Sequence, residues 1–235
     1  MPFRAESSSF RAYSARKPFP FHVCTMNADG SGNKRLTEKS ENKKIKQHID
    51  GIELDVHVTK DGEVVVTHDE KIDRVSNGSG FIKDMTLREL KRLSFHNHME
   101  SYVGAGIPTL REVLEYVSTT NMDVNIELKT GIYWYPQIEE KTAFIVQETG
   151  MHDRVIYSSF NHHSIAKIKE IDSTAETAWL FSDVILNVEQ YAKANGVEGL
   201  HPAVYHMYMS DFMKRWNESD SANVSMNNVA PVIKE

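Results

Sequence analysis

Cysteine and long apolar runs are scarce in this sequence, and each scarcity excludes a class of protein. Cys24 is the single cysteine, so an internal disulfide is excluded and a reducing compartment such as the cytoplasm is indicated. Apolar residues make up 40% of the 235 residues. No run of them approaches the roughly 20 residues that a membrane-spanning helix needs. The composition predicts a globular protein without a transmembrane segment, long enough for one large α/β domain.

Lysine and arginine are fewer than aspartate and glutamate, 27 against 33, and the positive charge is unevenly distributed. The net charge of −6 argues against general nucleic-acid binding, and we expect a small-molecule partner instead. Residues 1–49 nonetheless carry a net charge of +6, which leaves −12 for residues 50–235. We therefore expect a basic segment at 1–49, partly disordered or replacing a first strand near 19–25. The acidic domain at 50–235 would suit a bound cation.

Short apolar segments alternate with amphipathic ones after residue 50. This order is typical of βα units on a parallel sheet and favours a TIM-type (β/α)8 barrel. Two of the expected helices open with a Thr-Leu-Arg-Glu capping box, at Thr86 and at Thr109. The expected strands are 52–58, 63–67, 123–128, 154–159, 176–181 and 197–201, and further helices are expected at 137–149, 162–171, 187–195 and 210–216.

A pair of acidic residues in the first of these strands suggests a metal site. Side chains two residues apart on a strand face the same way, so Glu53 and Asp55 are neighbours. Two adjacent carboxylates repel each other unless a cation or a proton lies between them. A half-buried strand with its polar face in water would also explain the pair. Glu127, near the end of another strand, supplies a third carboxylate, and oxygen-only ligation favours Mg²⁺ or Ca²⁺ over zinc.

Further polar residues are expected at the mouth of the barrel, at the C-terminal ends of the strands. The catalytic residues of TIM-type barrels lie at this end. Lys129 can neutralise a phosphate oxygen, or it can pair structurally with Glu127. His68 follows the strand 63–67 and can donate a proton to a leaving oxygen. Ser158, Ser159, Asn161 and His201 also follow or close expected strands. Together these residues suggest metal-assisted cleavage of a phosphodiester.

The chain resembles the glycerophosphodiester phosphodiesterase family in five blocks that keep the family's order and spacing. They are I-E-L-D-V-x-x-T-K-D-G-x-x-V-V-x-H-D at 52–69, D-R-x-x-N-G-x-G at 73–80, I-P-T-L at 107–110, N-I-E-L-K at 125–129 and S-S-F-N at 158–161. The resemblance implies a TIM-type barrel with a small insertion at about 70–105. It also implies an enzyme of lipid and glycerol metabolism, a phosphoric diester hydrolase. Its substrates would be glycerophosphodiesters such as glycerophosphocholine, and its products an alcohol and sn-glycerol 3-phosphate.

The resemblance also implies roles for particular residues. Glu53, Asp55 and Glu127 would take the family's metal-ligand positions, for Ca²⁺ or Mg²⁺. Lys129 would contact the phosphate, and His68 would be one of two catalytic histidines.

Both ends of the chain depart from the family pattern. The family's first strand ends in H-R-G, whereas this chain has Phe21-His-Val-Cys24, which makes His22 the candidate for the second catalytic histidine. The family's late V-x-x-W-T-x-N block has its only counterpart at 222–229. We therefore expect the barrel to be incomplete or irregular at strands 1 and 8. Two alternatives stay open: a catalytically impaired relative that binds a cation and a phosphodiester without turnover, and a metal-dependent sugar isomerase.

Overall fold

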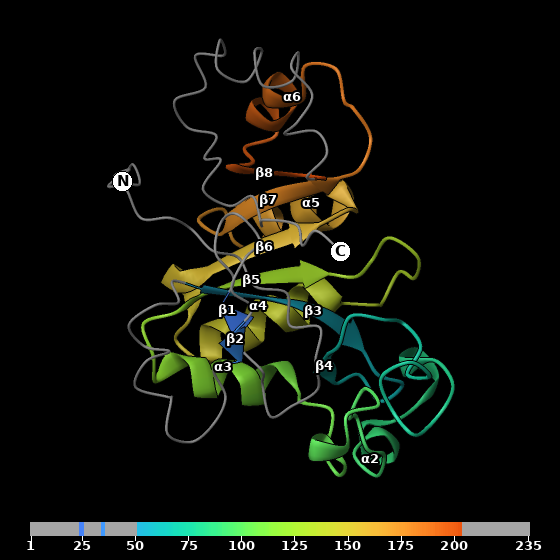
Figure 1. Cartoon of the computed structure of the whole chain (residues 1–235). Helices are drawn as coiled ribbons and strands as arrows, with labels where there is room; N and C mark the ends of the chain where they lie inside the picture. Colours follow the sequence, from blue (N-terminus) through green and yellow to red (C-terminus); the bar gives the residue numbers. More distant parts are fainter. Residues whose placement is uncertain (1–23, 26–33, 36–50, 204–235) are drawn as a thin grey trace.

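The fold is built on one six-stranded sheet, which Figure 1 shows as a stack of strands running from β8 down to β4. The computed structural model describes residues 24–25, 34–35 and 51–203. The strands of this sheet are β3 (Gly51–Val58), β4 (Val64–Val66), β5 (Asp123–Leu128), β6 (Val155–Ser159), β7 (Glu176–Phe181) and β8 (Gly199–Pro202). Every strand expected from residue 52 onward is therefore confirmed, with small shifts at its ends.

The helices follow the strands in the expected order. The longer ones are α3 (Leu110–Ser118), α4 (Ile138–Glu148), α5 (His162–Ile171) and α6 (Val188–Ala194). Short helical turns lie at α2 (Leu87–Leu90), η1 (Ile82–Asp84), η2 (Glu100–Tyr102) and η3 (His152–Arg154). The helix expected at 210–216 lies outside the described residues. No helix in the part of the chain that the structure describes is long and apolar enough to cross a bilayer.

The sheet has one apolar face and one polar face, because successive side chains of a strand point to opposite sides. In β3, Leu54 and Val56 are fully buried in the main core. That core also takes in the apolar side of α3, including Val113 and Leu114. The intervening residues of β3 face the other way, which we call the inner face of the sheet. The apolar pattern thus decides which face of β3 is left for polar chemistry.

Strand β4 differs from the other strands in direction. It pairs antiparallel with β3, whereas β3, β5, β6, β7 and β8 are parallel to their neighbours. The segment 63–67 is therefore not a further parallel strand of the barrel, and that part of our prediction is wrong. A parallel connection needs a crossover of a dozen or more residues, but only the turn around Gly62 separates β3 from β4. Gly62 has a φ of 88°, which suits a tight reversal of the chain.

The parallel strands form an incomplete TIM-type barrel, as expected. Over the described residues the sheet is open, with β4 at one edge and β8 at the other. In the range expected for a first strand, β1 (Cys24–Thr25) pairs with β2 (Lys34–Arg35) in a separate two-stranded sheet. His22 and residues 222–229 lie outside the described residues. The division into segments 1–49 and 50–235 stays a prediction.

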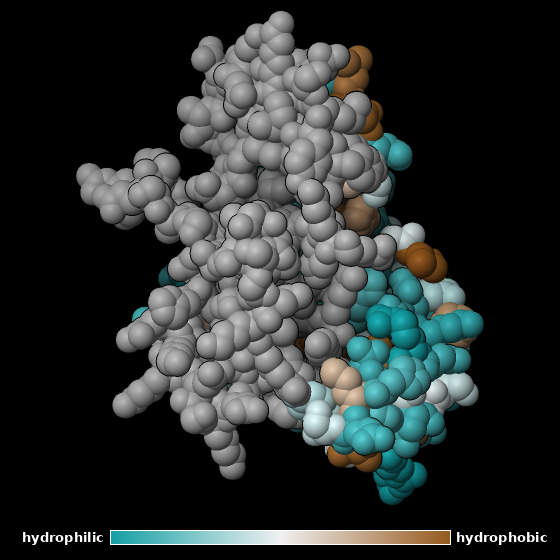
Figure 2. All heavy atoms as spheres, viewed as in Figure 1, coloured by the Kyte–Doolittle hydropathy of each residue, from teal (hydrophilic) through white to brown (hydrophobic). Residues whose placement is uncertain are grey.

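The expected insertion at about 70–105 packs around a small core of its own. Its buried side chains are Val65, Ile72, Val75, Ile82, Leu90, Phe95 and Ile107. Figure 2 shows its outer surface, at the lower right, as mostly hydrophilic. The insertion is therefore a separately packed unit joined to the edge of the sheet through β4.

Both predicted capping boxes form. At the start of α3, the Thr109 side-chain oxygen accepts a hydrogen bond from the Glu112 N–H at 3.2 Å. The Glu112 carboxylate accepts one from the Thr109 N–H at 2.8 Å. Thr86 and Glu89 make the same pair of bonds at the start of α2. These bonds satisfy backbone donors that the first turn of a helix leaves without partners.

Replacing Thr109 by alanine is expected to destabilise the protein by about 1 kcal/mol, because the cap of α3 is lost. In a chain of this size that corresponds to a decrease in Tm of roughly 2–4 °C, measurable by circular dichroism. Thr119→Ala, at the other end of the same helix, is the matched control and should leave Tm nearly unchanged. Equal losses in the two variants would contradict a specific capping effect.

Candidate active site

Three carboxylates meet on the inner face of the sheet. Asp55 on β3 lies directly opposite Glu127 on the parallel strand β5, and Glu53 lies two residues before Asp55 on the same face of β3. One oxygen from each carboxylate lies within 4.8 Å of the others. Asp55 is buried to 3% exposure, so water screens this group poorly. The structure thus brings together the three residues that the sequence predicts as metal ligands.

The cluster is short of positive charge. Burial, followed by the charges of Glu53 and Glu127, holds the pKa of Asp55 well above its usual value. Lys129 brings one positive charge, with its Nζ 3.1 Å from Glu127 Oε1 and 3.7 Å from Asp55 Oδ1. Burial alone would lower the pKa of Lys129, but the Glu127 and Asp55 carboxylates outweigh burial and raise it. One lysine against three carboxylates leaves a negative site, and its all-oxygen donor set fits a hard divalent cation.

His68 reaches this region through the β3–β4 hairpin. Because β4 runs antiparallel, it leads the chain back along β3, and the Thr67 N–H donates to the Asp55 carbonyl at 3.1 Å. His68 follows Thr67 directly. It therefore does not come from the C-terminal end of a parallel strand, as we expected, but from the returning arm of a hairpin. Its side chain is 40% exposed, which leaves it accessible to a small molecule.

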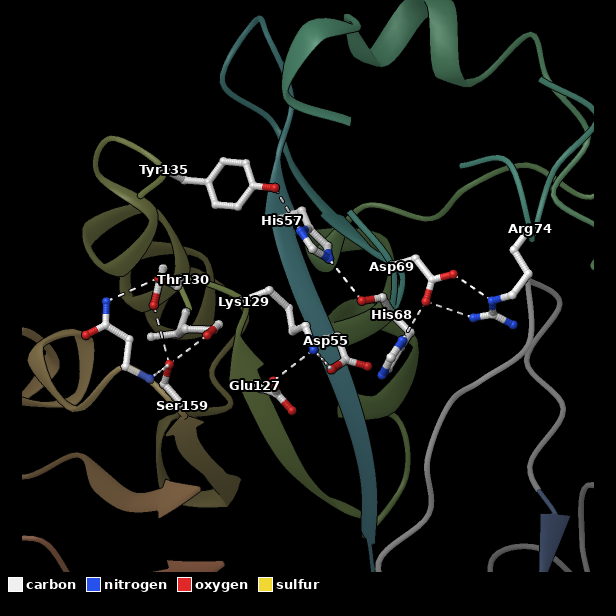
Figure 3. Close-up of polar contacts among 12 residues, drawn as sticks. Asp55, His57, His68, Asp69, Arg74, Glu127, Lys129, Thr130, Tyr135 and Ser159 are labelled. Atoms are coloured by element: carbon white, nitrogen blue, oxygen red, sulfur yellow. Dashed lines mark hydrogen bonds and ion pairs between the residues drawn. The ribbon is translucent and has the colours of Figure 1, made fainter. Parts of the chain in front are cut away.

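Asp69 and Arg74 hold the His68 ring in a hydrogen-bonded chain (Figure 3). Its Nδ1 lies 2.7 Å from Asp69 Oδ1. Arg74 donates to both oxygens of the same carboxylate, at 2.6 and 2.9 Å. This bond from Arg74 is the main reason why the pKa of Asp69 falls to about 2. An ionised carboxylate can only accept, so Nδ1 carries a proton and Nε2 is left for other chemistry.

His57 lies on the same face of β3 as Asp55, and it was not among the predicted site residues. It is fully buried, and burial lowers its pKa to about 3. Its Nδ1 lies 2.9 Å from the Tyr135 hydroxyl and its Nε2 lies 3.3 Å from the His68 carbonyl oxygen. The two-residue spacing after Glu53 and Asp55 was the sequence signal that could have identified it.

The remaining residues expected at the mouth separate into two groups. Ser159 faces the helices, where its hydroxyl donates to the Leu128 carbonyl at 2.7 Å and accepts from the Asn161 N–H at 3.0 Å. Asn161 caps α5 by accepting from the His163 N–H at 3.1 Å. These two residues therefore support the loops rather than the site.

Ser158 and His201 face inward instead. Ser158 pairs in register with Glu127, and its buried hydroxyl has no partner among the described residues. His201 is buried as well, and burial lowers its pKa to about 4. Its Nε2 finds no hydrogen-bond partner within the same residues.

Comparison with known proteins identifies the family. The model of the glycerophosphoryl diester phosphodiesterase family matches residues 30–225. The chain belongs to this family. A glycerophosphodiester phosphodiesterase from Caldanaerobacter subterraneus subsp. tengcongensis is 42% identical over 159 residues, covering 67% of this chain and 65% of that protein. One from Bacillus altitudinis is 44% identical over 157 residues, covering 66% and 64%. The matched region therefore spans slightly less than two thirds of these relatives.

Solved structures show the same fold. A putative glycerophosphodiester phosphodiesterase from Galdieria sulphuraria superposes with a TM-score of 0.70 at 22% identity, covering 93% of this chain and 82% of that one. A phosphodiesterase from Oleispira antarctica, solved in complex with the product sn-glycerol-3-phosphate, gives a TM-score of 0.62 at 26% identity. That match covers 72% of this chain and 71% of the other. The TIM-type architecture of the family member described here is thus confirmed.

Proposed function

We propose that this protein hydrolyses glycerophosphodiesters to an alcohol and sn-glycerol 3-phosphate, using a divalent cation, Mg²⁺ or Ca²⁺. The observation that carries the proposal is the convergence of Glu53, Asp55 and Glu127 within 4.8 Å of one another beside Lys129. The names of the relatives and the product bound to the Oleispira antarctica neighbour support the same substrate class.

The three carboxylates would hold the cation, and Lys129 would contact a phosphate oxygen. When bound, the cation supplies positive charge that offsets the negative charge of the phosphodiester in the transition state. Lys129 adds a second positive charge from a side chain that is 16% exposed, where it is held by Glu127. Both charges would act on a phosphate lying over the inner face of the sheet.

His68 would act as the general acid. In the reaction, a water oxygen attacks phosphorus, and the bond between phosphorus and the alcohol oxygen breaks. Protonated His68 gives its Nε2 proton to that leaving oxygen. Asp69, fixed by Arg74, keeps the other ring nitrogen protonated and the ring in place. The proton of the attacking water passes to a base, for which His22, outside the described residues, is our candidate.

The arrangement around His68 disfavours the alternative of a relative that binds without turnover. Binding a phosphodiester needs positive charge and hydrogen-bond donors, but it does not need an oriented proton donor. The His68–Asp69–Arg74 chain orients such a donor. The sugar isomerase alternative does not apply, because the chain belongs to the phosphodiesterase family.

The full chain, stripped of metal and supplied with glycerophosphocholine, tests the proposal. We expect release of sn-glycerol 3-phosphate with Mg²⁺ or Ca²⁺, and a loss of about a hundredfold or more in EDTA that added cation reverses. The product is measured with a coupled glycerol 3-phosphate dehydrogenase assay. A folded preparation that binds the cation, shown by a cation-dependent increase in Tm, but releases no product would contradict the proposed function.

A further inference from the structure

His57 connects β3, the strand that carries Glu53 and Asp55, to the proposed general acid, His68. It lies two residues beyond Asp55 on β3, with its ring fully buried on the same face. Figure 3 shows it between the Tyr135 hydroxyl and the backbone of His68. The proposed mechanism gives His57 no task, yet both of its ring nitrogens make a hydrogen bond.

The direction of these hydrogen bonds follows from the chemistry of the partners. A backbone carbonyl can only accept, so His57 Nε2 carries the proton and donates it to the His68 oxygen at 3.3 Å. In the neutral ring Nδ1 is then an acceptor, and the Tyr135 hydroxyl donates to it at 2.9 Å. Tyr135 is 3% exposed and packs edge-on against the His57 ring, with centroids 5.7 Å apart. Tyr135 therefore selects the tautomer of His57 that can hold the His68 carbonyl.

We infer that His57, oriented by Tyr135, is a positioning residue that fixes the backbone of His68 relative to the carboxylate cluster. His68 is thereby held at two points: Asp69 holds the ring and His57 holds the main chain. One strand, β3, carries both this anchor and two of the three metal-ligand candidates, Glu53 and Asp55, so its fixed rise sets the separation between cation and acid. The inference rests on the proposed function, because it concerns the placement of that reaction's acid.

Positioning of an acid has a signature that general loss of structure lacks. A leaving alcohol such as choline is a poor leaving group and needs a proton, whereas 4-nitrophenolate leaves without one. A misplaced His68 should therefore slow hydrolysis of glycerophosphocholine but not of glycerophospho-4-nitrophenol. Damage to the carboxylate cluster or to the fold should slow both reactions.

The test compares His57→Leu, His57→Gln and Tyr135→Phe on the two substrates. Since a displacement of about 1 Å can cost about a hundredfold, we expect His57→Leu to lower kcat for glycerophosphocholine by roughly tenfold to a hundredfold. The KM and the cation-induced increase in Tm should stay close to those of the parent. His57→Gln keeps an N–H donor and should regain most of the lost kcat. Tyr135→Phe should show a smaller loss, again confined to the poor leaving group.

A matched control and a double variant sharpen the result. Tyr157→Phe removes the hydroxyl of a buried tyrosine in the main core and should leave kcat on both substrates unchanged. In the double variant His57→Leu/His68→Ala, the His57 substitution should have no further effect, because the group it positions is gone.

The outcomes separate the two proposals. If the parent releases no product from either substrate, the proposed function fails. The positioning role fails if the parent is active but His57→Leu lowers kcat equally for both substrates. It also fails if the loss of kcat in His57→Leu adds fully to the loss in His68→Ala. Should His57→Leu not fold, Tyr135→Phe decides, since its ring packing is kept. If Tyr135→Phe then lowered kcat equally for both substrates, or lowered it for neither, the inference would be overturned.

Discussion

Asp55→Asn is expected to remove most of the activity and, without cation, to stabilise the fold. Asp55 is the most buried of the three carboxylates, and Glu53 and Glu127 repel its charge. A bound cation contributes several kcal/mol to such a reaction, so loss of a ligand should lower kcat/KM by roughly a hundredfold to a thousandfold. The same change removes a buried charge whose repulsion destabilises the cation-free protein.

The stability effect should depend on pH in a defined direction. The pKa of Asp55 is raised in the folded protein, so its carboxyl group binds a proton more tightly there than in the unfolded chain. In EDTA the parent should therefore lose stability as pH rises from about 4, the ordinary value for aspartate, through the raised pKa. The asparagine amide of the Asp55→Asn variant does not titrate, so the Tm advantage of the variant should grow over that window and then stay constant.

Thermal unfolding with and without cation measures both effects. The parent should gain several degrees of Tm when Mg²⁺ or Ca²⁺ is added, at roughly 2–4 °C per kcal/mol, and the variant should gain much less. Asp153→Asn is the matched control, because Asp153 is exposed just before β6, at the opposite end of the strands. A variant that lost stability in EDTA, or kept the full cation response, would contradict the metal site.

His68→Ala is expected to lower kcat for glycerophosphocholine by roughly a hundredfold to ten-thousandfold, the usual contribution of a general acid. Its KM and its cation response should change little, because the role proposed for His68 is to donate a proton and not to bind the substrate or the cation. With glycerophospho-4-nitrophenol the loss should be far smaller, since that leaving group needs no proton. Steady-state kinetics on the two substrates measure the effect.

Another histidine of this chain is paired with an aspartate and serves as the control. His152 Nδ1 lies 3.1 Å from Asp172 Oδ2, in the short helical turn that precedes β6. His152→Ala removes a comparable His–Asp pair, yet it should leave both substrates unaffected. Equal losses in the two variants would show that His68 acts through stability and not through proton donation.

Local sequence patterns determined most of the secondary structure. The strands follow from runs of apolar residues, and the starts of α2 and α3 from capping boxes that close within four residues. The gathering of Glu53, Asp55 and Glu127 was also predictable, because residue spacing fixes the face of each strand and parallel neighbours end at one edge of the sheet.

Only the tertiary structure decided how the other side chains meet. Apolar content does not specify strand direction, so β4 was predicted as a barrel strand although it returns along β3 and brings His68 with it. Likewise, Ser158 and Ser159 are adjacent serines that the sequence does not distinguish. The pleat of β6 points Ser158 to the inner face of the sheet and Ser159 toward the helices. The contact of His57 with Tyr135 joins residues 78 positions apart and depends on how the β5–α4 loop packs. The sequence by itself determined the family and the face on which Glu53, Asp55 and Glu127 meet, and the packing between distant segments decided where His68 is held.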